Sequence, residues 1–419
     1  MRPAVKRRVV VTGLGLLTSV GNDVKSTWEA IRAGKNGIAP ITLFDASESK
    51  VKVAGEVKGF DPTPLVGPRD ARRLDRAILL GIAAADEAYR SARLAPADYD
   101  PYRFGTYVAS GIGGLTTIWE EAKNAVAKGL DRMSPFFIPN AIVNLIGANV
   151  SIRFGLKGPN IPIVTACSAG TNAIGEAFRA IRDGYLDLAL AGGAEAAVNA
   201  FGVAGFANMK ALSTSADPET ASVPFDKRRS GFVMAEGAGI LVLEEYERAV
   251  ARKASIYGEV VGYGATSDAY HITAPDESAE AVARCMTLAL ADAGISPSDV
   301  GYVNAHGTST VLNDKFETLG IKKAFGPLAY ELSVSSTKSM TGHALGATGG
   351  IETILTLLAV KDGIVPPTIH YREPDPDCDL DYTPNVAKRK NLTYAMNVNL
   401  GFGGQNAAVV VKRIEGRAE

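Results

Sequence analysis

The chain of 419 residues has little cysteine and no excess of charge of either sign. Its three cysteines, Cys167, Cys285 and Cys378, are too few and too scattered for a disulfide framework, and an odd number suits a reducing compartment. We therefore expect a cytoplasmic protein. With 44 Lys and Arg against 45 Asp and Glu, no surplus positive charge is present to neutralise a phosphate backbone, so nucleic acid is not expected as a partner.

Uninterrupted apolar stretches are also missing. The run 188–207 is long enough to cross a membrane, but Glu195, Asn199 and several glycines interrupt it. The apolar residues that follow Arg8 resemble part of a signal peptide, yet they include threonine and glycine and no small-x-small cleavage site comes after them. The sequence thus predicts neither export nor membrane insertion.

Signatures of metal and nucleotide binding are absent. No HExxH or CxxC motif occurs, and the four histidines and three cysteines are not spaced as ligands. A Walker lysine motif is missing too, and the GxG at Gly13 and Gly15 has Thr18 where a third glycine belongs. We expect neither a metal nor an organic cofactor.

What the chain has in abundance is glycine, 44 residues, in tight clusters rather than in flexible linkers. Short apolar runs rich in β-branched residues alternate with helical patterns, which is typical of an α/β fold with a largely parallel sheet buried on both faces. The expected strands are 8–12, 104–109, 160–165, 186–190 and 239–243.

An internal duplication is indicated by two similar segments. In the first, a strand at 161–165 leads through a small-residue loop to a helix with apolar residues at Ile174, Ala177, Phe178 and Ile181. In the second, a strand at 332–336 leads to a helix whose apolar residues, Ile351, Ile354, Leu355 and Leu358, have the same spacing. Because a fresh strand pattern starts at 256–262, we divide the chain into halves 1–254 and 255–419.

Cys167 is the first candidate for chemistry. It lies between an apolar strand and the first turn of a helix, where unpaired backbone N–H groups and the helix dipole lower a thiol pKa. A buried structural cysteine is the alternative on this context alone. Cys285 and Cys378 lie in contexts that indicate no chemistry.

Two histidines stand where open α/β sheets place their ligands. His306 and His343 each follow a strand end and lie beside glycines. His271 and His370 have no such context, so an ordinary core or surface role is expected for them. The turn 401–404 carries one aromatic residue, Phe402, at an exposed tip, which is either a pocket gate or an ordinary tight turn.

At this point the residues coincide with a known family. The chain resembles the β-ketoacyl-[acyl-carrier-protein] synthases of the condensing-enzyme, thiolase-like superfamily, closest to their synthase II branch, over essentially its whole length. The shared motifs are VVTGLG at 10–15, VTACS at 164–168, PFD at 224–226, GFV at 231–233, NAHGTST at 304–310, KSMTGH at 338–343 and GFGG at 401–404.

The resemblance implies a five-layered α-β-α-β-α fold with two duplicated halves and decarboxylative condensation of acyl with malonyl carrier protein in fatty-acid elongation. Cys167 would carry the acyl group as a thioester. The backbone N–H groups of Cys167 and Phe402 would form the oxyanion hole. Neutral His306 and His343 would hydrogen-bond the malonyl thioester oxygen, and the positive charge of Lys338 would help to keep them neutral.

Other roles come from the same resemblance. The acyl pocket would be lined by Ile112 and Phe206, with Phe137 reaching it across the interface of a homodimer. A polar network behind the histidines would comprise Asp314, Glu317 and Glu352. A bound monovalent cation near Glu352 is left open. The expected partner is acyl carrier protein, in acyl and malonyl forms, docking on a basic patch for which the candidates are Arg69, Arg72, Arg73 and Arg132.

Three positions depart from the family pattern. The family often has His at the place of Asn172, an aromatic residue at that of Leu400 and Pro at that of Val311. All three are expected near the pocket, so acyl chain length stays open, and so does the choice between fatty-acid synthesis and a specialised polyketide pathway.

Rival families fit less well. A thiolase needs a second cysteine in a Gly-rich loop near the active site, which neither Cys285 nor Cys378 offers, and synthase III has Asn where His343 stands. A non-catalytic chain-length subunit would lack the nucleophile. The serious alternative is a ketosynthase of a specialised, polyketide-type pathway with the same chemistry.

Overall fold

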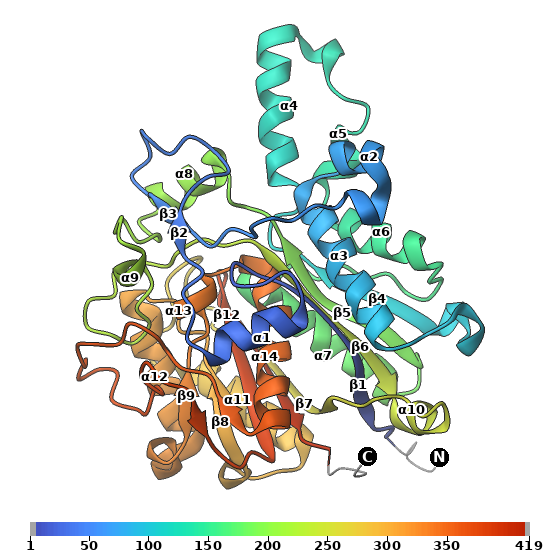
Figure 1. Ribbon diagram of the computed structural model, residues 1–419. Coiled ribbons are helices and arrows are strands. Elements are labelled where there is room, and N and C mark those ends of the chain that lie inside the picture. Colours follow the sequence, from blue (N-terminus) through green and yellow to red (C-terminus); the bar gives the residue numbers. More distant parts are fainter. Residues whose placement is uncertain (1–5, 415–419) are drawn as a thin grey trace.

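The computed structural model describes residues 6–414, and within that range nine strands form one large mixed sheet (Figure 1). These strands are β1 Val9–Leu17, β4 Phe104–Ala109, β5 Leu188–Glu195, β6 Gly237–Glu245, β7 Gly258–Ser267, β8 Val300–Asn304, β9 Ser333–Ser335, β12 Tyr394–Gly401 and β13 Gln405–Lys412. Two short pairs lie apart from it, β2 Ala39–Pro40 with β3 Val53–Ala54 and β10 Ile364–Val365 with β11 Lys388–Arg389.

The helices of the described range cover this sheet. They are α1 Val24–Arg32, α2 Thr63–Arg73, α3 Arg76–Ser91, α4 Leu115–Lys128, α5 Phe137–Ala141, α6 Asn144–Phe154, α7 Ala169–Arg182, α8 Ala200–Asn208, α9 Pro218–Ala221, α10 Tyr246–Ala251, α11 Glu280–Ala293, α12 Val311–Phe325, α13 Lys338–Thr341 and α14 Thr348–Asp362. Among them α4 projects away from the body of the molecule (Figure 1). None of the helices in residues 6–414 combines the length and the apolar character that crossing a membrane would require.

The strand order reveals the expected duplication. It runs β4-β5-β6-β1-β7-β13-β12-β8-β9, and the two halves meet where β1 pairs with β7. Outward from this junction, β1-β6-β5-β4 repeats the pairing pattern of β7-β13-β12-β8, with two antiparallel pairs followed by a parallel pair. The thiolase-like α/β fold with two related halves is thus present.

The expectation of a largely parallel sheet is wrong. Only the pairs β4–β5, β12–β8 and β8–β9 are parallel among the described strands, and the central pairs are all antiparallel. The prediction failed because helices cover both faces of the sheet. The antiparallel strands β1 and β6 are therefore almost wholly buried, as parallel strands usually are. A continuous apolar run reports burial on both faces and says nothing of strand direction.

The layers follow from which helices touch which strands. Helices α3 and α6 pack on the outer face of the N-terminal strands, and α11 and α12 form the outer layer of the C-terminal half. Between the halves lie α7 and α14, which pack against each other and against strands of both halves. Glycines allow this close approach: a Cβ on Gly349 of α14 would lie 2.1 Å from the backbone N of Thr171 in α7.

The segment 160–165 is not the full strand that its apolar residues predict. Asn160 makes one bridge to Thr106 of β4, and Ile161 donates its N–H to the carbonyl of the same threonine. Pro159 and Pro162 flank these contacts and lack the N–H groups that would continue the ladder. The segment runs along the outer edge of β4 as extended chain and ends at Cys167.

Candidate active site

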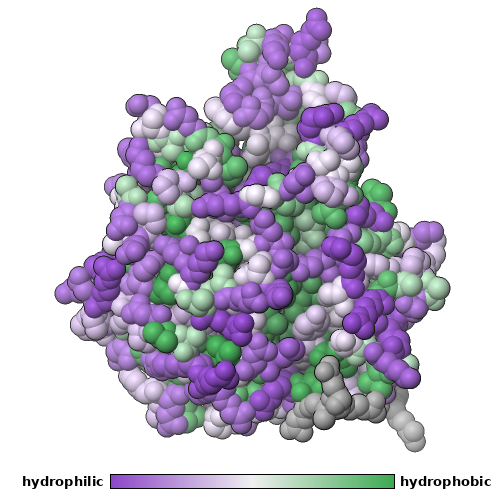
Figure 2. Space-filling view, in the orientation of Figure 1, coloured by the Kyte–Doolittle hydropathy of each residue, from purple (hydrophilic) through white to green (hydrophobic). Residues whose placement is uncertain are grey.

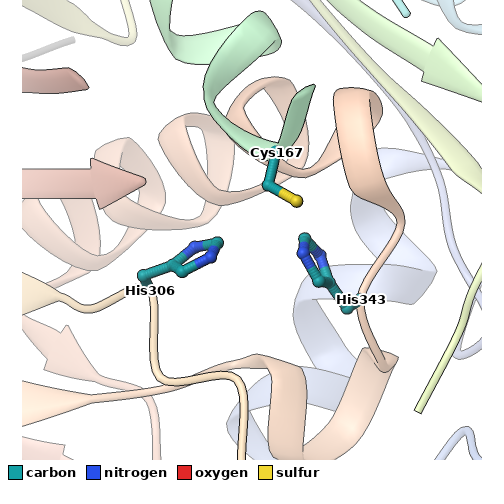
Figure 3. A group of neighbouring side chains, drawn as sticks. All are labelled: Cys167, His306 and His343. Carbon is teal, nitrogen blue, oxygen red and sulfur yellow. The ribbon is translucent and has the colours of Figure 1, made fainter. Parts of the chain in front are cut away.

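Three side chains from three separate loops converge at one point. Their candidate ligand atoms, the sulfur of Cys167 and one ring nitrogen each of His306 and His343, all lie within 4.8 Å of one another. The sulfur and both imidazole rings point toward a common centre (Figure 3). The ring centroids of the two histidines are 5.2 Å apart and the rings are nearly perpendicular. The three residues that sequence motifs singled out therefore form one cluster.

Cys167 lies in a short 3-10 turn, residues 166–168, that leads directly into α7. The preceding residue, Ala166, has a φ of 50°, a conformation that an alanine adopts only under constraint. This sharp turn presents the sulfur to the cluster. Burial raises the pKa of the thiol to about 12, against the charge of Lys338 and nearby backbone N–H groups, which lower it. The expected lowering of the pKa is therefore wrong, because desolvation outweighs the charge and the N–H groups that favour the thiolate.

Two backbone N–H groups face the sulfur, those of Phe402 and of Cys167 itself. Phe402 belongs to the turn between β12 and β13, where Gly403 and Gly404 adopt positive φ values of 89° and 73°. The N–H of Gly403 donates to the carbonyl of Ile272. Phe402 is only partly exposed, and its ring stacks on that of Phe206 with the ring centroids 6.3 Å apart. The sequence predicted an exposed aromatic side chain at the tip of this turn, and that prediction is wrong. Paired N–H groups at a nucleophile are the geometry of an oxyanion hole.

Each histidine is held through its backbone. The N–H groups of His306 and of Gly307 donate to the carboxylate of Glu317 in α12 at 2.6 and 2.7 Å. His343 exchanges backbone hydrogen bonds with Val233 and Ala235. Its Nδ1 lies 2.9 Å from the hydroxyl of Thr348, while its Nε2 is buried and has no partner in the described part of the chain.

Both imidazoles are kept neutral. Burial lowers the pKa of His306 and of His343 well below 6.5, and the charge of Lys338 lowers both further. Lys338 is itself buried, and its Nζ donates to Oε1 of Glu352 at 2.6 Å. An unprotonated imidazole offers one N–H donor and one acceptor nitrogen, so the cluster has donors for an oxygen that gains negative charge.

The acidic residues Glu317 and Asp314 behind the histidines accept hydrogen bonds from backbone N–H groups. Glu317 is fully buried, and desolvation raises its pKa to about 8. Asp314, also in α12, accepts the N–H groups of Phe225 and of Ser309. Ser309 has a φ of 68°, which Asp314 helps to hold. The loop that carries His306 is thus clamped by two carboxylates.

A cavity of about 340 Å³ opens onto the cluster. Cys167, His306, His343 and Phe402 all line it. Ile112 and Phe206 pack against the hydrophobic cluster that contains Cys167 and Phe232. Phe137 lies elsewhere in the chain: it belongs to α5 and lines a different groove together with Arg69, Arg72 and Arg73.

Several residues of the site were not predicted from the sequence. Asn399 of β12 lies 3.3 Å from Nδ1 of His306, and Phe232 packs edge-on against His343. Glu195, at the end of β5, accepts the N–H groups of Gly111 and Gly346 and so ties two loops of the site together. Asn399 and Glu195 lie within apolar runs outside the recognised motifs, so no sequence signal could have identified them, whereas Phe232 stands in the motif GFV at 231–233 without a role having been predicted for it.

The remaining histidines and cysteines stay outside the cluster. His271 is exposed and its Nδ1 accepts backbone N–H groups of Thr273 and Ala274. Cys285 and Cys378 are buried in the C-terminal core. Their surroundings indicate packing rather than chemistry.

Two sets of atoms have the chemistry of metal ligands. One thiol and two imidazoles are a set that zinc accepts, and Cys167 with the two histidines is the one such group among residues 6–414. This group was invisible in the sequence because its members come from three loops.

Beside Glu352, the side-chain oxygens of the paired Asn304 and Asn397 are buried without a partner in the described residues. Such oxygens suit a hard cation, so they fit the monovalent ion that the resemblance left open.

Comparisons with known proteins agree with this geometry. Residues 6–249 match the family model "Beta-ketoacyl synthase, N-terminal domain", and residues 257–372 match "Beta-ketoacyl synthase, C-terminal domain". The 3-oxoacyl-[acyl-carrier-protein] synthase 2 of Staphylococcus aureus (strain N315) is 51% identical over 409 residues, 98% of this chain and 99% of the relative. The protein of the same name from Synechocystis sp. is 47% identical over 411 residues, again 98% and 99%.

Solved structures show the same architecture. A β-ketoacyl synthase from Burkholderia phymatum STM815 superimposes with a TM-score of 0.90 at 35% identity, covering 98% of this chain and 100% of that one. A ketosynthase of a type II polyketide system, solved in complex with its acyl-carrier protein, gives a TM-score of 0.91 at 35% identity with the same coverage.

Proposed function

The chain belongs to the β-ketoacyl synthase family, and from that premise we propose that it condenses acyl-[acyl carrier protein] with malonyl-[acyl carrier protein]. The products are 3-oxoacyl-[acyl carrier protein] and carbon dioxide, and the reaction elongates fatty acids. The observation that carries the proposal is the convergence of Cys167, His306 and His343 within 4.8 Å beside the N–H of Phe402. The names of the relatives at 51% and 47% identity support the same reaction.

In the first half of the reaction Cys167 takes the acyl group. The sulfur attacks the thioester carbon of the acyl carrier protein, the tetrahedral oxyanion is held by the N–H groups of Cys167 and Phe402, and the carrier thiol leaves. Because the resting group is a thiol, its proton must depart during attack. The neutral imidazoles within 4.8 Å are the bases available to receive it.

In the second half, the bond between the malonyl carboxylate and the α-carbon breaks. Carbon dioxide leaves, and its electron pair forms an enolate whose oxygen accepts hydrogen bonds from His306 and His343. The enolate carbon then attacks the acyl thioester, and the sulfur of Cys167 departs. Lys338 acts from behind, since its charge lowers the pKa of both rings and so keeps them neutral.

The acyl chain occupies the apolar region around the sulfur. Ile112 and Phe206 lie beside the cluster of Cys167, and Phe402 stacks on Phe206, which supports their assignment to the acyl pocket and its gate. Phe137 is remote from Cys167 within one chain, so its proposed contact with the pocket requires the partner subunit of a dimer.

A homodimer is supported by the edge of the N-terminal strands. On the face seen in Figure 2, hydrophilic residues predominate and hydrophobic ones form small scattered patches. Along the segment beside β4, by contrast, Ile161 is 45% and Val164 51% exposed, and Ile152 of the neighbouring α6 is 77% exposed. An extended edge with exposed apolar residues is what a second copy covers.

Carrier-protein docking is proposed on the groove beside α2. Arg69, Arg72 and Arg73 line it together with Phe137, and Arg132 is exposed on the neighbouring 3-10 turn. Cations near a tunnel mouth steer an acidic partner by long-range attraction. The ketosynthase solved with its acyl-carrier protein supports a partner of this kind.

The specialised polyketide alternative has weaker support. The solved polyketide ketosynthase is 35% identical, against 51% for the fatty-acid synthase relative. A non-catalytic chain-length subunit is disfavoured because Cys167 is present and faces both histidines (Figure 3).

We also propose that the chain divides into the halves 1–254 and 255–419, and that the protein is located in the cytoplasm.

Mass spectrometry of the intact protein tests the proposal. Wild type and Cys167→Ala are incubated with C2 to C18 acyl carrier proteins and then with malonyl carrier protein. We expect acyl adducts on the wild type alone, and malonyl carrier protein should discharge them as 3-oxoacyl carrier protein. The range of acyl chain lengths that form adducts distinguishes a fatty-acid synthase from a ketosynthase of a specialised pathway. The absence of any adduct on the wild type would overturn the proposed function.

A further inference from the structure

Asn399 occupies an unusual place in the cluster of polar groups behind His306. It lies in β12, fully buried, three residues before Phe402. Its side-chain oxygen accepts hydrogen bonds from the hydroxyl of Thr171 and from the amide of Asn397. Its nitrogen donates to Oε2 of Glu352 at 2.7 Å and lies 3.3 Å from Nδ1 of His306. Every hydrogen-bonding position of the amide is therefore used.

These partners determine which way the amide points. Turning it over would place its oxygen against the carboxylate of Glu352, two acceptors in contact within a buried region, which is costly. The carboxylate cannot move away, because Nζ of Lys338 donates to its other oxygen at 2.6 Å. The nitrogen of Asn399 consequently faces His306 in the only arrangement that satisfies all four groups.

An amide nitrogen carries two hydrogens and has no acceptor capacity. Nδ1 of His306 must then be the acceptor in the contact with Asn399, so it carries no proton. An imidazole whose Nδ1 is unprotonated carries its single proton on Nε2. That is the nitrogen left to donate toward the cavity, which His306 lines.

We propose that Asn399 is the positioning residue that selects the Nε2–H tautomer of His306, through its bonds to Thr171 and to the Lys338–Glu352 pair. The inference rests on the proposed function, because the selected N–H is the one that donates to the enolate oxygen during decarboxylation. Asn399 touches no substrate atom. Its effect belongs to the malonyl half of the reaction, while acyl transfer to Cys167 does not need it.

The substitution Asn399→Asp tests this with almost no change of shape. The new oxygen lies against Oε2 of Glu352 as well as Nδ1 of His306, so the two carboxyl groups share one proton. The new carboxyl group then accepts a hydrogen bond from a protonated Nδ1, which stabilises the other tautomer and leaves a lone pair on Nε2. We expect decarboxylation of malonyl carrier protein to fall about 100-fold at pH 8, the typical loss for one donor. Acyl loading of Cys167 should stay within about threefold. At lower pH the ring gains a second proton, Nε2 donates again, and the variant should recover while the wild type does not change.

Two controls accompany the variant. Asn149→Asp makes the same change in α6, where the amide donates only to the carbonyl of Leu145, and should leave both half reactions unaltered. If Asn399→Asp does not fold, nitrogen-15 NMR of histidine-labelled wild type, assigned with His306→Gln, reports the tautomer directly. A signal of unprotonated Nδ1 and protonated Nε2 is expected.

Three results would overturn the inference: unchanged decarboxylation in Asn399→Asp, equal loss of both half reactions without recovery at low pH, or a protonated Nδ1 in the wild type. Failure of the proposed function would look different. In that case the wild type itself would neither load an acyl group nor release carbon dioxide from malonyl carrier protein.

Discussion

At the scale of single residues, the charge state of the two imidazoles depends on one buried lysine. Lys338 is 1% exposed and reaches the site through its charge rather than by a hydrogen bond to either ring. Its positive charge adds to burial in lowering the pKa of His306 and His343. Only a neutral ring can accept the proton of the Cys167 thiol, so acyl transfer is lost as the pH falls through the pKa values of the two rings.

Replacing Lys338 by methionine should therefore move the acid limb of the pH profile. Without the charge, the pKa values of both histidines rise, and we expect acyl transfer to Cys167 at pH 6 to fall roughly 10- to 100-fold with a smaller loss at pH 8. The measurement is the rate of acyl loading of Cys167 from acyl carrier protein between pH 5 and 8. Lys361→Met, at the exposed end of α14, is the matched control. An acid limb at the same pH in wild type and Lys338→Met would contradict this role.

The sequence predicted the reacting residues better than their surroundings. Cys167, His306 and His343 stand in recognisable motifs, so they could be named in advance. The raised pKa of Cys167 could not, because a helix terminus is visible in the sequence whereas the burial that outweighs it depends on the whole fold. Asn399 was missed because its partners come from α7, α14 and the loop after β8, which only the tertiary structure brings together.

At the scale of elements, the contact between α7 and α14 depends on glycine. A Cβ on Gly170 would lie 2.7 Å from the backbone N of Gly350, and one on Gly349 would lie 2.1 Å from the N of Thr171. These are backbone atoms that no rotamer change can move. The helices that carry the nucleophile loop and the histidine loop can meet only because side chains are missing between them.

Gly349→Ala should lower the free energy of unfolding by about 3 kcal/mol, the upper end of the usual cost of overpacking, because the clash is with backbone. Gly205→Ala, in α8, is the matched control, since nothing lies within 4 Å of the added methyl. That change should be neutral or should stabilise by up to about 1 kcal/mol. Urea unfolding measures both, and equal stabilities of the two variants would refute the packing argument.

Element identity was predicted from the sequence, but direction and pairing were not. The apolar runs at 104–109 and 239–243 correspond to β4 and β6. The alternation of strands and helices favoured parallel neighbours, yet β6 runs antiparallel to both β1 and β5. Hydrophobic pattern reflects which faces are covered, and the helices cover both faces whichever way a strand runs.

At the scale of the whole molecule, the proposed dimer should depend on the extended edge beside β4. Val164→Asp places a charge on that edge, where a second copy would have to bury it, and we expect a shift from dimer toward monomer. Tyr185→Asp changes a more exposed residue elsewhere, at 78% against 51% for Val164, and should remain dimeric. Analytical ultracentrifugation across a range of concentrations distinguishes them. A wild type that sediments as a monomer would refute the dimer itself.

The two-fold repeat of the fold was foreseeable from the strand-loop-helix segments with equal helix spacing, but the way the halves share one site was not. The nucleophile belongs to the first half, and both histidines, the buried lysine and the turn of Phe402 belong to the second. Neither half holds a complete set of reacting groups.

This division has a consequence during synthesis on the ribosome. Cys167 emerges long before the turn at 401–404 that supplies an N–H beside its sulfur. A nascent chain, or one truncated before that turn, carries the thiol without the groups that activate a thioester. The oxyanion hole is therefore complete only after the second half has been synthesised and folded against the first.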